Sequence, residues 1–219
     1  MGVYLCTNRE NYTISNIPTT DINFKKMFHH ELKNAYIGGY YEYSYDFRNS
    51  STSQITSDGW SYSAWATPSF WTYGVYGNPA RLSYDISAYI SNAKKITISF
   101  NAKTSSSSWW WVRLAKTVTS STREGLTWPW YNGASDTYID IYSNGHTFSS
   151  ISAGTYNFKW IIDLENKTWR LSITWKSDQT WTLTDTEVSN IINNTTKLFV
   201  YDSWPSSDWI IDMYLTIDY

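Results

Sequence analysis

The chain has 219 residues, a length that one β-sandwich reaches and that is short for two full-sized domains. Charged residues make up 16% of it and aromatic residues 19%, a composition too apolar and too aromatic for a disordered protein. The formal net charge is -2 and the basic residues are scattered, which argues against nucleic acid or anionic lipid as a partner. No stretch approaches the roughly 20 apolar residues that a membrane-spanning helix needs, so we expect no membrane insertion.

Residues 1–39 differ from the rest of the chain and predict an N-terminal arm. Apolar residues recur at three- and four-residue steps from Phe24 to Ala35, after the candidate N-cap residues Thr20 and Asp21. This spacing predicts a short helix. Two interpretations stay open: the helix plugs one end of the main domain, or the arm serves docking and assembly, with a homo-oligomer as one product.

Residues 40–219 predict a single antiparallel sandwich of the all-β class. Aromatic and β-branched residues fill this stretch, and Gly, Asn and Asp interrupt it, which favours strands joined by turns. Apolar and polar residues alternate over Ile96–Phe100. A hairpin is indicated over Tyr156–Trp175, around the polar turn Asp163–Lys167. Because strands do not alternate with helices along the chain, a parallel sheet is not expected.

The last part of the chain predicts a short helix and a closing strand. The helix is expected within Thr184–Asn194, capped by Thr184 or Asp185. From Asp208 to Tyr219 apolar residues occupy every second position, which places one face of the strand in the core. The residues that we expect to be buried between the sheets are Phe158, Trp160, Trp169, Leu171, Ile173, Trp209, Ile211 and Leu215.

An aromatic run in the middle of the chain forms the first candidate ligand-binding face. One parity of Trp109–Leu114 is wholly apolar, which predicts that Val112 and Leu114 face the core. The other parity carries Trp109, Trp111 and Arg113. Two aromatic rings and a guanidinium are suited to stacking on sugar rings and to binding their hydroxyl groups.

Two further segments, 128–131 and 138–142, add to this candidate face. In the later segment Ile139 and Ile141 are expected to point inward. In the earlier one Pro129 stiffens an expected loop that exposes the neighbouring rings. The ligand-binding candidates from the two segments are Trp128, Trp130, Tyr138, Asp140 and Tyr142. The alternative is that protein covers these rings: long loops, the N-terminal arm or another subunit.

Six motifs follow one another in an order typical of one fold. They are Tyr45-Asp46-Phe47, Gly59-Trp60, Ile96-Thr97-Ile98-Ser99-Phe100, the hairpin Tyr156 to Ile173, Lys197-Leu198-Phe199-Val200 and Trp209-Ile210-Ile211-Asp212. Over residues 40–219 this order resembles the concanavalin A-like, laminin-G-like jelly roll. The resemblance implies two curved antiparallel sheets, one convex and one concave, with glycan often bound on the concave face or on the loops beside it.

The Ser-, Thr-, Asn- and Tyr-rich texture and the N-terminal arm also resemble bacteriophage head-fibre, decoration and tail adhesion proteins. This second resemblance implies a virion surface protein with an extracellular location. Its implied partners are other virion structural proteins and a cell-surface glycan.

An enzyme of the same fold is the alternative function. Laminarinase-type glucanases present Glu-x-Asp-x-Glu on one strand, where one carboxylate attacks and another protonates, and this chain has no such run. Asp136 and Asp140 would share one face of a strand but lie about 13 Å apart, too far for glycoside hydrolysis. We therefore predict a non-enzymatic binding protein, with a glycoside hydrolase built from carboxylates on different strands as the alternative.

No cofactor is predicted, although calcium stays open. Jelly rolls of the kind that this chain resembles often bind calcium, and Asp residues are plentiful here. Yet the chain has no Asp-x-Asp-x-Asp loop, so no metal ligand can be named.

Overall fold

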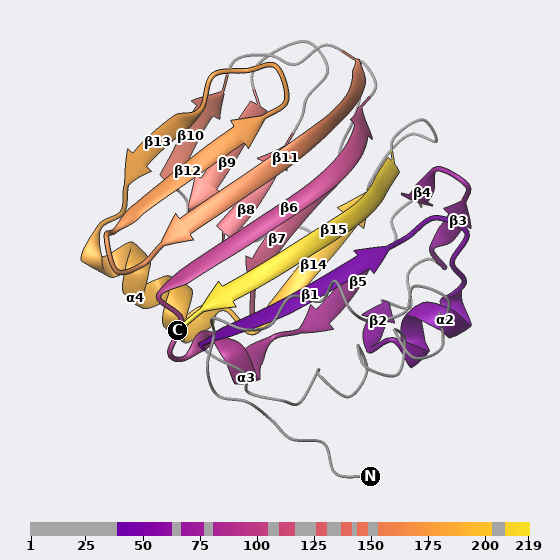
Figure 1. Cartoon of the computed structure of the whole chain (residues 1–219), viewed down its shortest axis with the longest axis horizontal. Coiled ribbons are helices and arrows are strands. Elements are labelled where there is room, and N and C mark those ends of the chain that lie inside the picture. Colours follow the sequence, from indigo (N-terminus) through magenta and orange to yellow (C-terminus); the bar gives the residue numbers. More distant parts are fainter. Residues whose placement is uncertain are drawn as a thin grey trace, which may run out of the picture.

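A computed structural model of the chain describes residues 39–62, 67–76, 81–104, 110–116, 126–130, 137–141, 144–148, 153–202 and 209–219. These residues form two antiparallel sheets that pack face to face (Figure 1). The jelly-roll sandwich predicted from the sequence is confirmed as the fold. The helix predicted in the N-terminal arm lies outside the described residues.

We call the larger sheet sheet A, and it holds the first and the last described strands. Its strands are β13 (Gln179–Thr182), β12 (Thr168–Ile173), β11 (Gly154–Asp163), β6 (Lys95–Thr104), β15 (Trp209–Asp218), β4 (Gly74–Tyr76) and β3 (Ser69–Trp71), in that order, with β1 (Tyr40–Asp46) also paired to β15. The β1–β15 pairing runs from Tyr40 opposite Asp218 to Asp46 opposite Asp212. The first and last described strands therefore lie side by side within sheet A.

The second sheet, sheet B, packs behind sheet A in the view of Figure 1. Its order is β10 (Asn144–Phe148), β9 (Thr137–Ile141), β8 (Leu126–Trp130), β7 (Trp110–Ala115), β14 (Lys197–Asp202), β5 (Arg81–Asp85) and β2 (Trp60–Tyr62). The helices of the described residues are short: α2 (Thr52–Ser57), α3 (Ser87–Ile90) and α4 (Asp185–Asn194).

Two local predictions are confirmed. Strands β11 and β12 form the expected hairpin, with Asp163 opposite Thr168 at its end. Helix α4 begins after Thr184, whose hydroxyl accepts from the Glu187 N–H while the Glu187 carboxylate accepts from the Thr184 N–H. This capping box satisfies two backbone donors that the first helical turn leaves unpaired.

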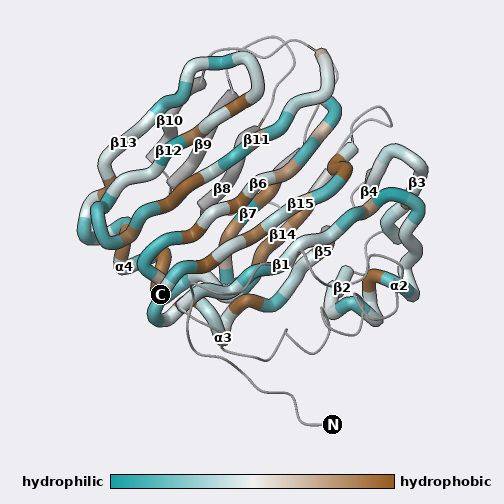
Figure 2. Tube along the Cα trace, viewed as in Figure 1, coloured by the Kyte–Doolittle hydropathy of each residue, from teal (hydrophilic) through white to brown (hydrophobic). Residues whose placement is uncertain are grey.

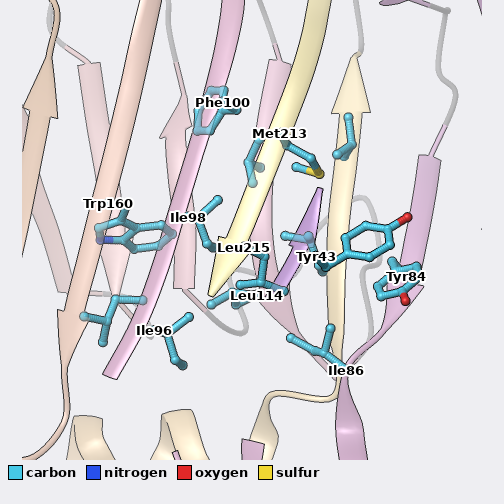
Figure 3. Close-up of a cluster of buried hydrophobic side chains, with 14 of the residues drawn as sticks. Tyr43, Tyr84, Ile86, Ile96, Ile98, Phe100, Leu114, Trp160, Met213 and Leu215 are labelled. Carbon is cyan, nitrogen blue, oxygen red and sulfur yellow. The ribbon is translucent and has the colours of Figure 1, made fainter. Parts of the chain in front are cut away.

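The core lies between the sheets and draws on both of them (Figure 3). In sheet A, Ile96, Ile98 and Phe100 of β6 alternate with polar residues and are fully buried. Figure 2 shows apolar residues recurring along the central strands. Of the predicted core residues, six are buried: Phe158, Trp160, Trp169, Leu171, Ile173 and Leu215.

Aromatic side chains join the first strand to sheet B. Tyr43 of β1 stacks on Tyr84 of β5, with ring centroids 4.1 Å apart. Its hydroxyl accepts from Trp60 Nε1 at 2.7 Å, and burial raises the pKa of Tyr43 above its usual range. Because these polar atoms are paired, the buried tyrosines fasten β1 to the opposite sheet without an unsatisfied group at this point.

Two sequence predictions were wrong. In β15, Trp209 and Ile211 are partly exposed and Ile210 is buried at 1% exposure, because the register shifts between Ile210 and Asp212 and reverses the alternation. Residues 126–130 form strand β8 and not an exposed loop. The β8–β9 register is irregular between Thr127 and Trp130, so Pro129 lies where its missing N–H interrupts no regular ladder.

Candidate functional site

The predicted aromatic face falls in sheet B. Val112 and Leu114 of β7 are fully buried in the core, as the parity of that run predicted. Arg113 is opposite Thr127 of β8, and Thr127 is opposite Asp140 of β9. Strand pairing therefore places Arg113 and Asp140 in one row across the sheet, which their separation in the sequence did not reveal.

The Arg113 side chain was expected to be exposed to solvent as a hydrogen-bond donor, and it is buried. It is only 4% exposed although it alternates with core residues, and Phe199, opposite it on β14, is also buried. This part of the outer face of sheet B is thus covered.

The side chains of the other seven ligand-binding candidates are not among the described parts of the chain. Trp109 and Tyr142 lie outside the described residues, and for Trp111, Trp128, Trp130, Tyr138 and Asp140 only the backbone is described. Trp128 is opposite Val112 in the register of β7 and β8. Arg113 and Asp140 belong to the neighbouring row, through Thr127. The ligand-binding role of all eight residues stays a prediction.

The outer face of sheet A carries a row of polar side chains from four adjacent strands. Asp46 of β1 is opposite Asp212 of β15, Asp212 is opposite Asn101 of β6, and Asn101 is opposite Asn157 of β11. We call these four residues the polar row. Asp46, Asn101 and Asn157 alternate with residues that are buried in or packed against the core, and Asp212 directly precedes the buried Met213 after the register shift of β15. The pleat therefore directs all four away from the core.

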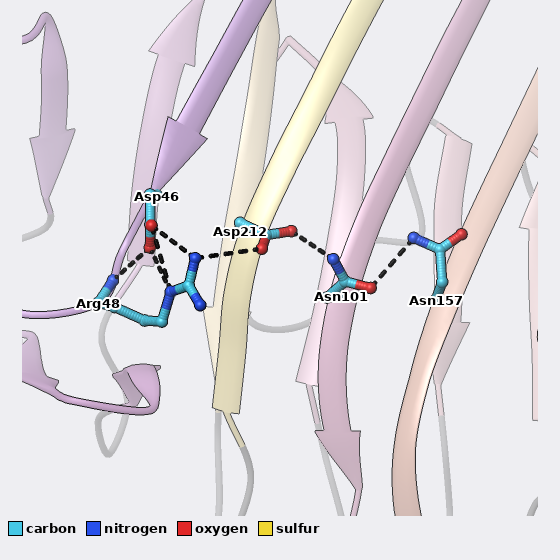
Figure 4. A network of polar contacts seen from close by, with 5 residues as sticks. All are labelled: Asp46, Arg48, Asn101, Asn157 and Asp212. Atoms are coloured by element: carbon cyan, nitrogen blue, oxygen red, sulfur yellow. Dashed lines mark hydrogen bonds and ion pairs between the residues drawn. The ribbon is translucent and has the colours of Figure 1, made fainter. Parts of the chain in front are cut away.

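Hydrogen bonds, together with ion pairs from Arg48, connect the polar row from end to end (Figure 4). Asn101 Nδ2 donates to Asp212 Oδ1 at 2.7 Å, and Asn157 Nδ2 donates to Asn101 Oδ1 at 3.1 Å. At the other end Arg48 donates to Asp46 from Nε at 2.9 Å and from Nη2 at 2.7 Å. Arg48 Nη2 also lies 4.0 Å from Asp212 Oδ2, so one guanidinium serves both carboxylates.

The ion pair between Arg48 and Asp46 favours the ionised form of the Asp46 carboxyl at the β1 end of the row. The hydrogen bonds from Arg48 hold the pKa of Asp46 below its usual value. A carboxyl whose pKa is lowered stays ionised throughout the neutral pH range. Asp46 is therefore an ionised hydrogen-bond acceptor for Arg48.

An open depression of about 330 Å³ lies over Asp46, Asp212 and Asn101 of the polar row. Its lining residues are Ser44, Tyr45, Asp46, Ser99, Asn101, Asp212, Met213 and Tyr214. They come from β1, β6 and β15. Carboxylate, amide and hydroxyl groups contribute to this lining beside apolar surface, which gives it both donors and acceptors.

Exposed aromatic rings adjoin the polar row at the β3–β4 corner of sheet A. Trp71 is 54% exposed and Tyr73 is 64% exposed. Their ring centroids lie 6.5 Å and 5.8 Å from that of the partly exposed Trp209. We call Trp71, Tyr73 and Trp209 the aromatic cluster.

Register and backbone contacts place the aromatic cluster next to the polar row. Trp209 is opposite Lys103 of β6, two residues along that strand from Asn101, and two residues of a strand span about 7 Å. The Asn49 N–H donates to the Trp71 carbonyl and the Phe47 N–H to the Ile211 carbonyl, both at 3.0 Å. Arg48 lies between these two anchored residues, so the same contacts position the cluster and the arginine.

Sequence reasoning missed this site although part of it was visible. Asp46 and Asp212 belong to motifs that indicated the fold, and Trp209 was expected in the core. The segment Trp71-Thr72-Tyr73-Gly74 places two aromatic residues beside a glycine, a signal for an exposed turn with rings on it. The β15 register shift, which moves Trp209 out of the core, has no sequence signal that we can identify.

The described part of the chain was searched for metal-binding groups of side chains and for membrane-spanning helices. No group of three or more His, Cys, Asp or Glu side chains is arranged to hold a metal ion there. Among the described helices, none has the length and apolar character needed to cross a bilayer.

No family model and no curated protein matches the chain. Several solved structures have a similar fold at low sequence identity. A protein of unknown function from Shewanella oneidensis MR-1 has a TM-score of 0.54 and 14% identity, covering 92% of this chain and 96% of that one. Lectin II from Ulex europaeus has a TM-score of 0.56 and 10% identity, covering 83% and 100%. Peanut lectin has a TM-score of 0.54 and 10% identity, covering 82% and 98%. The sandwich thus has the lectin-like jelly-roll fold.

Proposed function

We propose that this protein is a non-enzymatic carbohydrate-binding protein whose site is the outer face of sheet A. The observation that carries the proposal is the aromatic cluster lying beside the polar row. Exposed rings offer apolar faces to the C–H groups of a sugar, and carboxylate, amide and guanidinium groups bind its hydroxyls. The lectin-like fold supports the same class of ligand.

The polar row favours binding over hydrolysis, the alternative function. Asp46 and Asp212 are opposite each other on different strands, as a hydrolase assembled across strands would require. A glycoside hydrolase needs one of its two carboxyl groups protonated, which calls for a raised pKa. Arg48 lowers the pKa of Asp46, so Asp46 does not fit the role of this protonated acid. We propose that Asp46 and Asp212 bind sugar hydroxyls instead.

Replacing Trp209 with alanine tests the proposed site. We expect at least about tenfold weaker saccharide binding, equivalent to about 1.4 kcal/mol, because one ring of the cluster is lost. The matched control is Trp175→Ala, since Trp175 is 92% exposed in the turn after β12 and lies outside the cluster. A glycan array identifies the saccharide, and titration calorimetry measures the dissociation constant for each variant.

A third variant separates the two candidate faces. If Trp209→Ala binds as tightly as the wild type and Trp111→Ala does not bind, the site lies on sheet B, as the aromatic run of β7 predicted. If both variants bind as tightly as the wild type, neither Trp209 nor Trp111 contributes to saccharide binding. Reducing-end release from the bound saccharide would instead identify a hydrolase.

We also propose the surface of a bacteriophage particle as the setting. The Ser-, Thr-, Asn- and Tyr-rich texture and the N-terminal arm support it. Display of many copies would raise avidity where a single site binds weakly. Removing residues 1–38 is expected to lower both the mass of the protein in solution beyond the loss of the arm and its occupancy on particles. Light scattering and quantitative mass spectrometry of purified particles measure the two, and no change in either would contradict an assembly role.

A further inference from the structure

We infer that the ligand of the sheet A site is an uncharged, soluble oligosaccharide chain that lies across the strands, from the aromatic cluster along the polar row. This inference rests on the proposed function and specifies its ligand. It uses three properties of the site: its length, the angles between its rings and the state of its charges.

The polar row is longer than the contact that one sugar ring makes. It takes one residue from each of β1, β15, β6 and β11, and three strand spacings give a length of about 14 Å. Each residue presents a hydrogen-bonding group on the same face. Asn157 lies at the end far from Arg48, so only a chain of linked sugars reaches both Asn157 and the β1 end of the row.

The rings of the aromatic cluster do not form a flat surface. The Trp71 and Trp209 rings are inclined at 66°, and the Tyr73 and Trp209 rings at 53°. A crystalline polysaccharide presents coplanar sugar rings and would need coplanar aromatic partners. Inclined rings instead suit a single chain whose successive sugars are turned relative to one another.

The charges in the polar row disfavour an anionic sugar. The guanidinium of Arg48 is held by both oxygens of Asp46 and also faces Asp212. A ligand carboxylate that pairs with Arg48 would compete with Asp46 and would lie close to Asp212. Lys103 and Lys159 occupy the adjacent rows and are exposed to solvent, where their attraction for an anion is screened. The hydroxyls of a neutral sugar meet no such conflict.

A length series on the full chain tests the inference. The probes are glucose, galactose and mannose homo-oligosaccharides from the monosaccharide to the hexasaccharide, measured by calorimetry. We expect the affinity to rise at least about tenfold along the series that binds. Asn157→Ala should weaken the binding of the longer members several-fold and leave the shortest binding member unchanged. Trp209→Ala should weaken every member.

The controls keep the result interpretable. Asn193→Ala, on the exposed side of helix α4, is the matched control for Asn157→Ala. Because Asn157 is exposed, its truncation leaves no core cavity, and an unchanged melting temperature verifies this. Asn157→Asp is a second variant, which keeps the side-chain shape but removes the amide donor.

Each alternative outcome overturns a defined part of the inference. Equal affinity for the monosaccharide and the longer chains would overturn the extended site, as would equal effects of Asn157→Ala on short and long members. Tighter binding of sialyllactose or of oligogalacturonate would overturn the neutral ligand. Adsorption to microcrystalline cellulose or chitin that depends on Trp209 would overturn the single-chain mode. Absence of binding to every saccharide would overturn the proposed function itself.

Discussion

Replacing Trp169 with alanine is expected to lower the free energy of unfolding by about 3 to 5 kcal/mol, because it removes a large buried ring. Trp169 is 1% exposed and lies between two other indoles. Its ring stacks on Trp181 of β13 with centroids 4.1 Å apart and meets Trp160 of β11 edge-on at 6.2 Å. Trp169 thus packs against a side chain of each neighbouring strand of sheet A.

Urea unfolding followed by circular dichroism measures the effect. The control is again Trp175→Ala, which should change the free energy of unfolding by about 0.5 kcal/mol or less, because the ring is almost fully exposed. A Trp169→Ala variant that melts within a degree or two of the wild type would mean that the core does not lie between the sheets as described.

Replacing Gly74 with alanine is expected to lower the free energy of unfolding by about 3 kcal/mol. The same variant should also bind saccharide more weakly. The backbone of Gly74 has φ of +129°, which side-chain-bearing residues rarely adopt. A Cβ atom there would lie 2.3 Å from the Ile210 carbonyl oxygen and 2.9 Å from the Ile211 Cα. Both are backbone atoms of the β15 register shift, so relief requires β4 to move away from β15.

The consequence for binding follows from the position of Gly74. Gly74 directly follows Tyr73, and the next residue, Val75, pairs β4 with β15, the strand that carries Trp209. Separating β4 from β15 therefore separates the rings of the aromatic cluster. Gly39→Ala is the matched control: Gly39 also has a positive φ, of +78°, but nothing lies within 4 Å of its Cβ position. That variant should cost about 1 kcal/mol and leave saccharide binding unchanged. Equal losses in the two variants would show that contact with β15 plays no part.

Local patterns determined much of the fold. The alternation of β6 and of the β11–β12 hairpin, and the Thr184–Glu187 capping box, were predictable because each depends on residues close together in the chain. The same holds for the parity of Val112 and Leu114, since a strand has only two faces.

Tertiary structure decided the candidate site. The polar row joins residues as far apart in the chain as Asp46 and Asp212, and only the strand order and register of sheet A place them together. A one-residue shift in β15 turned Trp209 from a predicted core residue into a partly exposed member of the aromatic cluster, because every side chain changes face when the register slips by one. The sequence by itself therefore determined which residues form strands and, for most strands, which face is apolar. Which polar residues meet on the other face depended on pairings between distant segments, and no local pattern of side chains encodes them.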